Sequence, residues 1–186
     1  MIPVAFYQDS KAVFAKAMGE LVEKEPLDSI TVNDIVEKAS ASRTTFYRYF
    51  KDKNDLLAYV YTKMASDLIE HAERTHLSNY GLALDIIKYI QSRPGFFKKA
   101  FADSGQNSFF DTYCDYTYEV WLRRINKKYE CAPPVLSLMA RAYTYGTCAV
   151  VREWVLGGYK LPTETVARAL DDACPQALTA LCGSEG

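Results

Sequence analysis

The chain has 186 residues, and its 22 Lys and Arg residues nearly balance its 23 Asp and Glu residues, giving a formal net charge of −1. This balance excludes a protein that binds polyanions through its overall charge, so any affinity for nucleic acid must come from a local basic patch. No apolar run is long enough to cross a bilayer and the first residues do not form a secretion signal, which predicts a cytoplasmic protein.

Apolar spacings of three and four recur along the chain, whereas strict alternation is rare, and this pattern predicts an all-α fold. A first helix with one apolar face is expected from Ser10 until Pro26 ends it. Thr31 then begins a short second helix as its N-cap, with Asp34 in the capping-box position. That helix is expected to end near Ser40.

A further N-cap follows at once, at Ser42. Two caps this close leave room only for two short helices and a tight turn, which is the spacing of a helix-turn-helix. With Ser42 as the cap, Phe46, Tyr49 and Phe50 fall on one side of the helix and can pack into the core. The residues on the opposite side are polar or basic: Arg43, Thr44, Tyr47 and Arg48.

The stretch from Lys38 to Lys53 holds five basic residues and one acidic residue, a local charge of +4. A narrow helix with Arg and Thr near its amino end fits the major groove, where Arg can donate to guanine and the Thr methyl group can contact thymine. Polar groups suited to DNA phosphates are found at Thr31, Ser42, Thr45, Tyr47 and Lys53. The alternative is that these residues form only a solvated surface.

These residues resemble the DNA-binding domain of the tetracycline-repressor (TetR) family of bacterial regulators. The similarity covers about residues 10–59 and is carried by residues 30–36 and 42–50, with Ala39, Lys53, Leu56 and Leu57. The resemblance implies a homodimeric, all-helical regulator, usually a repressor, whose carboxy-terminal domain binds a small molecule and the partner subunit.

By position, the resemblance places DNA bases against Arg43, Thr44 and Arg48. It places the DNA backbone against Thr31, Ser42, Thr45, Tyr47 and Lys53. One departure is Ser40, which stands where the family commonly has Gly. A left-handed turn costs Ser more than Gly, so the turn could differ slightly in conformation.

Asp52 is expected to cap a long fourth helix over residues 53–76, which continues into the second half without a flexible linker. We therefore predict a three-helix DNA-binding domain over residues 1–55 and a helical effector-binding and dimerisation domain over residues 56–186. Further helices are predicted over residues 82–91, 94–102, 108–128, 134–156 and 162–181. Pro175 should kink or interrupt the last of them.

The last two of these helices carry apolar stripes that predict a four-helix interface in a homodimer, since two-fold symmetry is the ordinary way to read a palindromic operator. Small residues in the first stripe would let two helices approach closely. It consists of Val135, Met139, Ala142, Gly146, Ala149 and Val150. The second consists of Val166, Ala169, Leu170, Ala173, Ala177, Leu178 and Leu181. The alternative is that both stripes pack inside one subunit.

Aromatic residues are dense between Phe96 and Trp121. Such a cluster is more often plain core than a ligand site, and the sequence alone does not decide between the two. Side chains that join an apolar body to a polar tip nevertheless suit a concave ligand pocket with a few orienting groups. The candidate ligand-binding residues are Phe97, Phe101, Phe110, Tyr113, Tyr116 and Trp121.

Signals for an enzyme, a metal or a cofactor are weak. Asp67 and His71 lie four residues apart on the predicted fourth helix, but a catalytic zinc site needs a third ligand and His76 falls off that face, so an exposed ion pair is preferred. No nucleophile arrangement or phosphate loop is recognisable. The cysteines are odd in number and scattered, which predicts reduced, mostly buried thiols without disulfides or zinc. They are Cys114, Cys131, Cys148, Cys174 and Cys182.

The leading hypothesis is therefore a ligand-responsive transcriptional regulator, and more specifically a repressor that a small molecule releases from a palindromic operator. One alternative is a small-molecule-binding helical protein or an enzyme whose helix-turn-helix is non-functional. Another is an interaction module whose basic helix binds an acidic protein. Selection from random duplex DNA separates these hypotheses, because neither alternative should enrich a two-fold symmetric motif.

Overall fold

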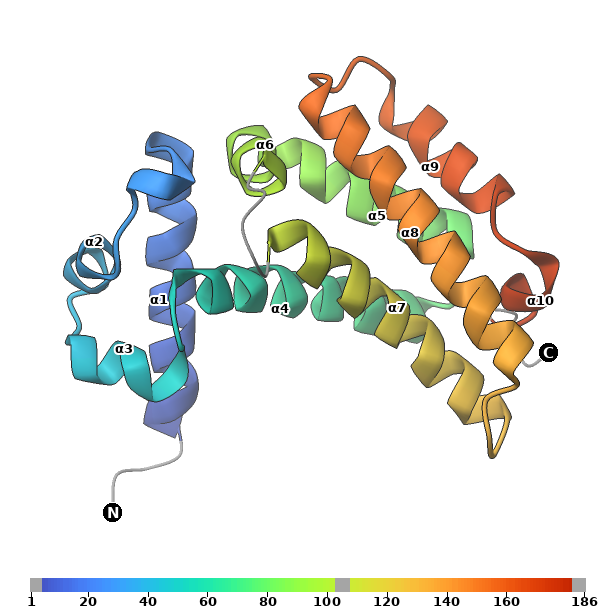
Figure 1. Cartoon of the computed structure of the whole chain (residues 1–186), viewed down its shortest axis with the longest axis horizontal. Coiled ribbons are helices and arrows are strands. Elements are labelled where there is room, and N and C mark those ends of the chain that lie inside the picture. The colour runs from blue at the N-terminus through green and yellow to red at the C-terminus, as the bar shows by residue number, and fades with distance from the viewer. Residues whose placement is uncertain (1–4, 103–107, 182–186) are drawn as a thin grey trace.

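The computed structural model describes residues 5–102 and 108–181. Every regular element within these residues is a helix, so the predicted all-α fold is confirmed. The first three α-helices form one end of the molecule, α4 runs away from them, and the later helices gather round the far part of α4 (Figure 1). Within the described residues, no helix combines the length and the apolar character that crossing a membrane requires.

The helices of the first half follow the predicted order. They are α1 (Ala5–Lys24), the 3₁₀ turn η1 (Leu27–Ser29), α2 (Val32–Lys38), α3 (Arg43–Tyr49) and α4 (Lys53–Thr75). The second half consists of α5 (Asn79–Ser92), α6 (Pro94–Ala102), α7 (Phe109–Lys128), α8 (Pro134–Leu156), α9 (Thr163–Asp172) and α10 (Gln176–Thr179). Pro175 interrupts the last predicted helix by taking an extended conformation at the start of α10.

Side-chain caps set the boundaries of α2, α3 and α4. In the capping box of α2, the N–H of Thr31 donates to the Asp34 carboxylate at 2.7 Å, and the N–H of Asp34 donates to the Thr31 hydroxyl. Hydrogen bonds from the Thr31 side chain and backbone hold the pKa of Asp34 below its ordinary value. Ser42 accepts from the N–H of Thr45 at 3.1 Å, and Asp52 caps α4 in the same way. The caps thus place α2 and α3 as close together as the sequence predicts.

The turn between α2 and α3 is a Schellman motif with Ser40 in the left-handed region, at a φ of 50°. The N–H of Ser40 donates to the carbonyl of Glu37, and the N–H of Ala41 donates to the carbonyl of Val36. The turn therefore keeps the left-handed conformation although this residue carries a Cβ, at a cost of roughly 1–2 kcal/mol.

We expect Ser40→Gly to raise the free energy of unfolding by up to about 1 kcal/mol. Glycine accepts a positive φ without the Cβ clash, and its greater freedom in the unfolded chain offsets part of the gain. Ser40→Ala is the matched control, because it keeps the Cβ and should bring no such gain. Urea unfolding followed by circular dichroism measures both variants. Equal stability of the two would contradict strain at this turn.

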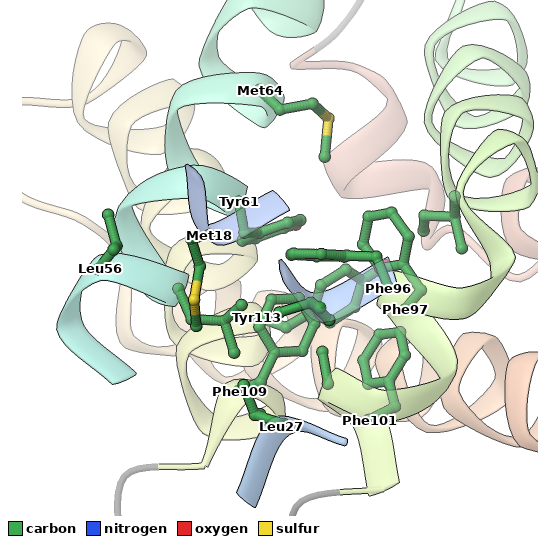
Figure 2. Packing of buried hydrophobic residues seen from close by; sticks show 14 of the residues in the cluster. Met18, Leu27, Leu56, Tyr61, Met64, Phe96, Phe97, Phe101, Phe109 and Tyr113 are labelled. Carbon is green, nitrogen blue, oxygen red and sulfur yellow. The ribbon is translucent and has the colours of Figure 1, made fainter. Parts of the chain in front are cut away.

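One apolar core continues from α3 to the second half of the molecule. Phe46 and Phe50 of α3 are 0% and 3% exposed and meet the ring of Phe14 on α1 edge-on, at centroid distances of 5.4 and 6.2 Å. Tyr49, which the sequence assigned to the same inner face, is only half-buried. Along α4 the core passes through Tyr61 into the aromatic cluster of α6 and α7 (Figure 2). The rings of α3 therefore fix its orientation on α1 and expose its other side.

The end of α1 is held by α6. Lys99 of α6 donates from Nζ to the carbonyl oxygens of Val22 and Glu23, at 2.5 and 3.3 Å, which satisfies carbonyl groups in the last turn of α1. A Cβ added at Gly95 would lie 2.8 Å from a carboxylate oxygen of Glu23, so the two helices approach closely here. This contact joins the amino-terminal helices directly to the second half, in addition to the continuous α4.

Candidate functional site

The outer face of α3 presents the polar and basic side chains that the sequence assigned to it. Arg43, Thr44, Tyr47 and Arg48 are all exposed, and Tyr47 is 49% exposed in spite of its ring. Arg43 donates to Oδ1 of Asn33 on α2 at 2.6 Å and lies over the Tyr47 ring at 5.6 Å from its centroid. The side chain of Arg48 has no hydrogen bond or ion pair with any other residue in the part of the chain that the structure describes. The face therefore carries one guanidinium held in place and one that extends into solvent.

Hydroxyl groups gather at the starts of α2 and α3. The hydroxyls of Ser42 and Thr45 lie 2.9 Å apart, and the Thr31 hydroxyl donates to the Asp34 carboxylate at 2.6 Å. Thr31 and Ser42 are exposed, and Thr45 is half-buried. These groups lie at the surface beside helix N-termini, where an anion such as a phosphate is favoured. At Thr31 a phosphate would have to replace the hydrogen bond to Asp34.

Lys53 has surroundings that the sequence did not reveal. Its Nζ donates to the carbonyl oxygens of Leu27, Asp28 and Ile30, at 2.8, 3.3 and 2.9 Å. The ammonium thus binds η1 to the start of α4, and a phosphate would compete with three carbonyls for it. The acceptors lie 23 to 26 residues earlier in the chain, so no local spacing could have indicated them.

We expect Lys53→Met to lower the free energy of unfolding by roughly 1–3 kcal/mol, because partly buried carbonyls lose a charged donor while the apolar stem keeps its length. Lys51→Met is the control, since Lys51 is exposed two residues away. Thermal unfolding of both variants gives the comparison. Unchanged stability together with weaker DNA binding would instead assign Lys53 to a phosphate.

The positive charge exposed around α3 is smaller than the +4 that the sequence gives for residues 38–53. Among the basic residues between positions 38 and 53, Lys53 turns inward and Lys38 pairs with Glu20 of α1 at 2.8 Å. The hydrogen bond and charge of Lys38 hold the pKa of Glu20 below its ordinary value. Arg43, Arg48 and Lys51 remain exposed. The basic patch is thus concentrated on α3 and the residues just after it.

A second candidate site is a cavity of about 110 Å³ lined by residues of α4, α5, α7, α8 and α9. Of the six aromatic candidates, Tyr113, Tyr116 and Trp121 lie on its wall. Tyr61 of α4 and Tyr143 of α8 complete an aromatic lining that sequence reasoning missed. Those two residues lie outside the aromatic run, and only the packing of distant helices brings them to the cavity.

The three phenylalanine candidates are not on this wall. Phe97 and Phe101 are 1% and 0% exposed and pack in the core, where Figure 2 shows them beside Phe109. Phe110 lies under the guanidinium of Arg152, which is 5.0 Å from its ring centroid. The aromatic run therefore divides into apolar rings in the core and rings with a polar atom at the cavity.

Two of the phenol groups on the cavity wall, those of Tyr61 and Tyr113, are deeply buried. Burial raises the pKa of Tyr61 and of Tyr113 well above the ordinary value for tyrosine. Tyr143 donates to the carbonyl of Leu170 on α9 at 2.7 Å, so its hydroxyl joins α8 to α9 at the cavity wall. The cavity can thus offer hydrogen bonds from uncharged hydroxyls in mostly apolar surroundings.

The possible metal ligands named from the sequence do not form a group. Within the described ranges, no three metal-ligating side chains come together. Asp67 pairs with Lys63 and not with His71, so the ion pair proposed from the sequence has a different partner, because Lys63 also lies one turn away.

The free thiols differ in their exposure. Cys114 and Cys148 are buried, Cys174 is half-buried and Cys131 is exposed, whereas Cys182 lies outside the described residues. The expectation of mostly buried thiols is therefore wrong for Cys131, which follows the end of α7. Contact with Cys114, together with burial, raises the pKa of Cys148 on the cavity wall, so its thiol stays protonated.

Comparison with known protein families shows which family this chain belongs to. Residues 16–60 match the family of bacterial regulatory proteins described as the tetR family. Residues 78–174, more than half of the chain, match the family described as the transcriptional regulator C-terminal region. The chain belongs to the TetR family. It is therefore a DNA-binding transcriptional regulator with an amino-terminal helix-turn-helix domain and a helical carboxy-terminal domain, and the family is not one of enzymes.

Individual TetR-family relatives are similar over nearly the whole chain. The HTH-type dhaKLM operon transcriptional activator DhaS of Lactococcus lactis subsp. lactis (strain IL1403) is 25% identical over 155 residues, which cover 82% of each protein. A solved structure of the dihydroxyacetone kinase operon activator DhaS has a TM-score of 0.63 at 22% identity, over 92% of this chain and 94% of its own.

Two further solved structures share the fold. A TetR transcriptional regulator from Rhodococcus sp. RHA1 has a TM-score of 0.67 at 15% identity, over 92% of this chain and 96% of its own. FadR from Bacillus subtilis, solved in complex with stearoyl-CoA, has a TM-score of 0.53 at 18% identity, over 89% of this chain and 97% of its own. At these identities the similarity concerns the TetR fold alone.

Proposed function

We propose that this TetR-family regulator binds a palindromic operator as a homodimer, and that a small molecule in its cavity changes its affinity for that operator. The observation that carries the DNA-binding part is the two-sided α3. Phe46 and Phe50 hold one side in the core, so Arg43, Thr44 and Arg48 extend together from the other. A helix exposed in this way can enter the major groove of DNA.

The polar side chains divide between base and backbone contacts. The residues proposed to contact base edges are Arg43, Thr44 and Arg48. Those proposed to contact the DNA backbone are Thr31, Ser42, Thr45 and Tyr47, together with the N–H groups at the helix starts. For Lys53, the hydrogen bonds to three carbonyls support a positioning role at the start of α4 rather than a direct phosphate contact.

An apolar face of α8 that no other described residue covers supports the homodimer. Val135, Leu138 and Val150 are 65%, 67% and 45% exposed, and Ala142 and Gly146 are exposed between them. A Cβ at Gly146 would meet no atom within 4 Å, so the middle of this face is open. The α8 helices of two copies could therefore approach closely at Gly146.

The stripe predicted on the last helix supports a smaller contribution to the dimer. Val166 and Leu178 are 3% and 0% exposed and pack within the subunit. Ala169, Ala173 and Ala177 are exposed, so they remain available for contact with a partner subunit. We propose residues 1–55 as the DNA-binding domain and residues 56–186 as the effector-binding and dimerisation domain, with α4 crossing the boundary.

The path of α4 supports ligand control of DNA binding. α4 begins next to α3, and its residues Tyr61, Ala65 and Ile69 line the cavity. A ligand that displaces α4 would change the separation of the two α3 helices in the dimer. The ligand can shift DNA affinity only as far as it binds one arrangement better than the other.

The direction of regulation depends on the promoter. The Lactococcus relative is named as an activator, whereas the sequence alone favoured a repressor. The same DNA contact can exclude or recruit polymerase according to where the operator lies. A reporter gene carrying the selected operator, with and without this chain, measures which of the two applies.

Selection of the full chain against random duplex DNA tests the proposal. The expected result is an enriched inverted repeat, because two copies of α3 related by a two-fold axis contact two equivalent half-sites. A small-molecule-binding protein with a non-functional helix-turn-helix would enrich no motif. A module for an acidic protein would enrich no symmetric motif. Either of these results would overturn the proposal.

A further inference from the structure

We propose that Asn33 of α2 is a positioning residue, which holds the Arg43 side chain in place for contact with a base edge in the major groove. Asn33 acts through Arg43 and does not contact a base itself. The inference rests on the proposed function, because it takes Arg43 as one of the residues that contact bases. It adds a residue that determines specificity from α2, outside the helix that enters the groove.

A hydrogen bond between side chains joins α2 to α3 at this point. Nη1 of Arg43, the first residue of α3, donates to Oδ1 of Asn33 at 2.6 Å. The two residues are ten positions apart, and the turn between the helices brings them together. A hydrogen bond with one charged partner is about twice as strong as a neutral one. The guanidinium of Arg43 is therefore tied to the neighbouring helix.

Tyr47 makes a second contact with the same guanidinium. Nη2 of Arg43 donates to the Tyr47 hydroxyl at 3.3 Å, and the guanidinium carbon lies 5.6 Å from the centroid of the Tyr47 ring. A guanidinium over an aromatic ring is attracted by the charge distribution of the ring. Contacts with residues of two helices thus restrict this long side chain to one region of the outer face of α3.

These contacts leave Arg43 able to bind a base. A guanidinium has more N–H donors than the two hydrogen bonds use. Arg43 and Asn33 are both exposed, so DNA can reach the remaining donors. Guanine presents O6 and N7 as acceptors in the major groove, and one Arg can donate to both. The guanidinium can therefore bind a guanine while it keeps its hydrogen bond to Asn33.

Arg48 on the same helix provides the contrast. Its side chain is exposed and has no hydrogen bond or ion pair with another described residue. Binding to a base must order such a side chain, at a cost in conformational entropy. Arg43 has lost much of that freedom before DNA binds, so its contact with a base should meet a smaller cost. The two arginines should therefore differ in mobility in the free protein.

Side-chain NMR of the full chain without DNA tests the positioning. Nitrogen relaxation at Nε reports the fast motion of each arginine side chain. We expect Arg43 to be more rigid than Arg48, and Asn33→Ala to raise the mobility of Arg43 toward that of Arg48. Asn33→Asp is the matched variant, because it keeps an acceptor and should leave Arg43 rigid. Equal mobility of the two arginines, or no change in Asn33→Ala, would overturn the inference.

Base preference gives the second measurement. The probes are the inverted repeat enriched from random DNA and duplexes that differ from it at one base pair. Asn33→Ala should reduce discrimination about two- to tenfold at the base pair that Arg43→Ala relaxes, because the matching base pair then has to order that side chain and the others do not. Discrimination at the base pair that Arg48→Ala relaxes should stay the same, which is the internal control.

The double variant Asn33→Ala with Arg43→Ala separates positioning from direct contact. If Asn33 acts only through Arg43, the double variant has the base preference of Arg43→Ala alone. A further loss of discrimination would make Asn33 a base contact, and an equal loss of affinity for every duplex would make it a phosphate contact. Either result would overturn the inference. Thermal unfolding of Asn33→Ala should stay close to that of the unsubstituted chain, because the bond lies at the surface.

The outcomes separate this inference from the proposed function. A relaxed preference in Arg43→Ala beside an unchanged preference in Asn33→Ala would reject the positioning role and leave the proposed regulator. An unchanged preference in Arg43→Ala would remove Arg43 as a base contact and this inference with it. Selection that enriches no repeat would reject the proposed operator binding, and with it any role of Asn33 in specificity.

Discussion

Replacing Arg48 by Ala should relax the preference of this regulator at one base pair in each half-site, with a loss of about 1–3 kcal/mol of discrimination there. Arg48 is exposed on α3, and its side chain has no hydrogen bond or ion pair with another described residue. Its removal should therefore cost the free protein little stability. Arg43→Ala should relax a different base pair, and it also removes the hydrogen bond to Asn33.

A competition panel of operators, each changed at one base pair, measures this effect. Lys51→Ala is the control, because Lys51 is exposed just after α3 and should bind phosphate without reading sequence. That variant should weaken binding to every operator alike and reduce the dependence of affinity on salt. If Arg48→Ala weakened every operator by one factor, Arg48 would be a phosphate contact and α3 would read bases through other residues.

Gly146→Arg should convert the proposed dimer to a monomer and remove measurable operator binding. Within one subunit the space at Gly146 is open, so the new side chain has room and the fold should be kept. Between two α8 helices the same side chain would occupy the point of closest approach. Loss of the dimer separates two half-site contacts that otherwise act together, which costs far more affinity than any one contact.

Gly146→Ala is the matched variant for this experiment. Both substitutions remove a glycine from the interior of α8, so both should stabilise the helix by about 1 kcal/mol. Only arginine adds the bulk that separates two subunits. Light scattering after gel filtration gives the mass of each variant, and fluorescence anisotropy gives its operator affinity. A Gly146→Arg protein that stays dimeric would place the interface elsewhere than on this face of α8.

The amino-terminal half of the fold could be predicted because its signals are local. Thr31, Ser42 and Asp52 each cap a helix through an N–H two or three residues away, and the spacing of Phe46 and Phe50 alone assigns the inner side of α3. Such contacts form within one turn, where sequence distance and spatial distance agree. The left-handed turn at Ser40 was harder to predict, because the Schellman hydrogen bonds of Ser40 and Ala41 override the residue's own conformational preference.

The cavity could be predicted only in part, because its wall is assembled from helices far apart in the chain. Tyr113 and Phe101 belong to one dense aromatic run, yet packing places the first at the cavity and the second in the core. The same difficulty applies to the two apolar stripes, one on α8 and the other on α9 and α10. Periodicity shows that Val135 and Val166 each belong to an apolar face, but it does not say that Val166 is covered within the subunit and Val135 is not.

The bond from Lys99 to the end of α1 restricts how the amino-terminal helices can move. These helices meet the rest of the chain at the start of α4, in the apolar core that α1 shares with α4 and α6, and at the ammonium of Lys99. A group of helices packed on a continuous core moves as one body more easily than it bends at a single joint. A displacement of α4 would therefore carry α1 and α3 with it, and α6 would have to follow or slide against the last turn of α1.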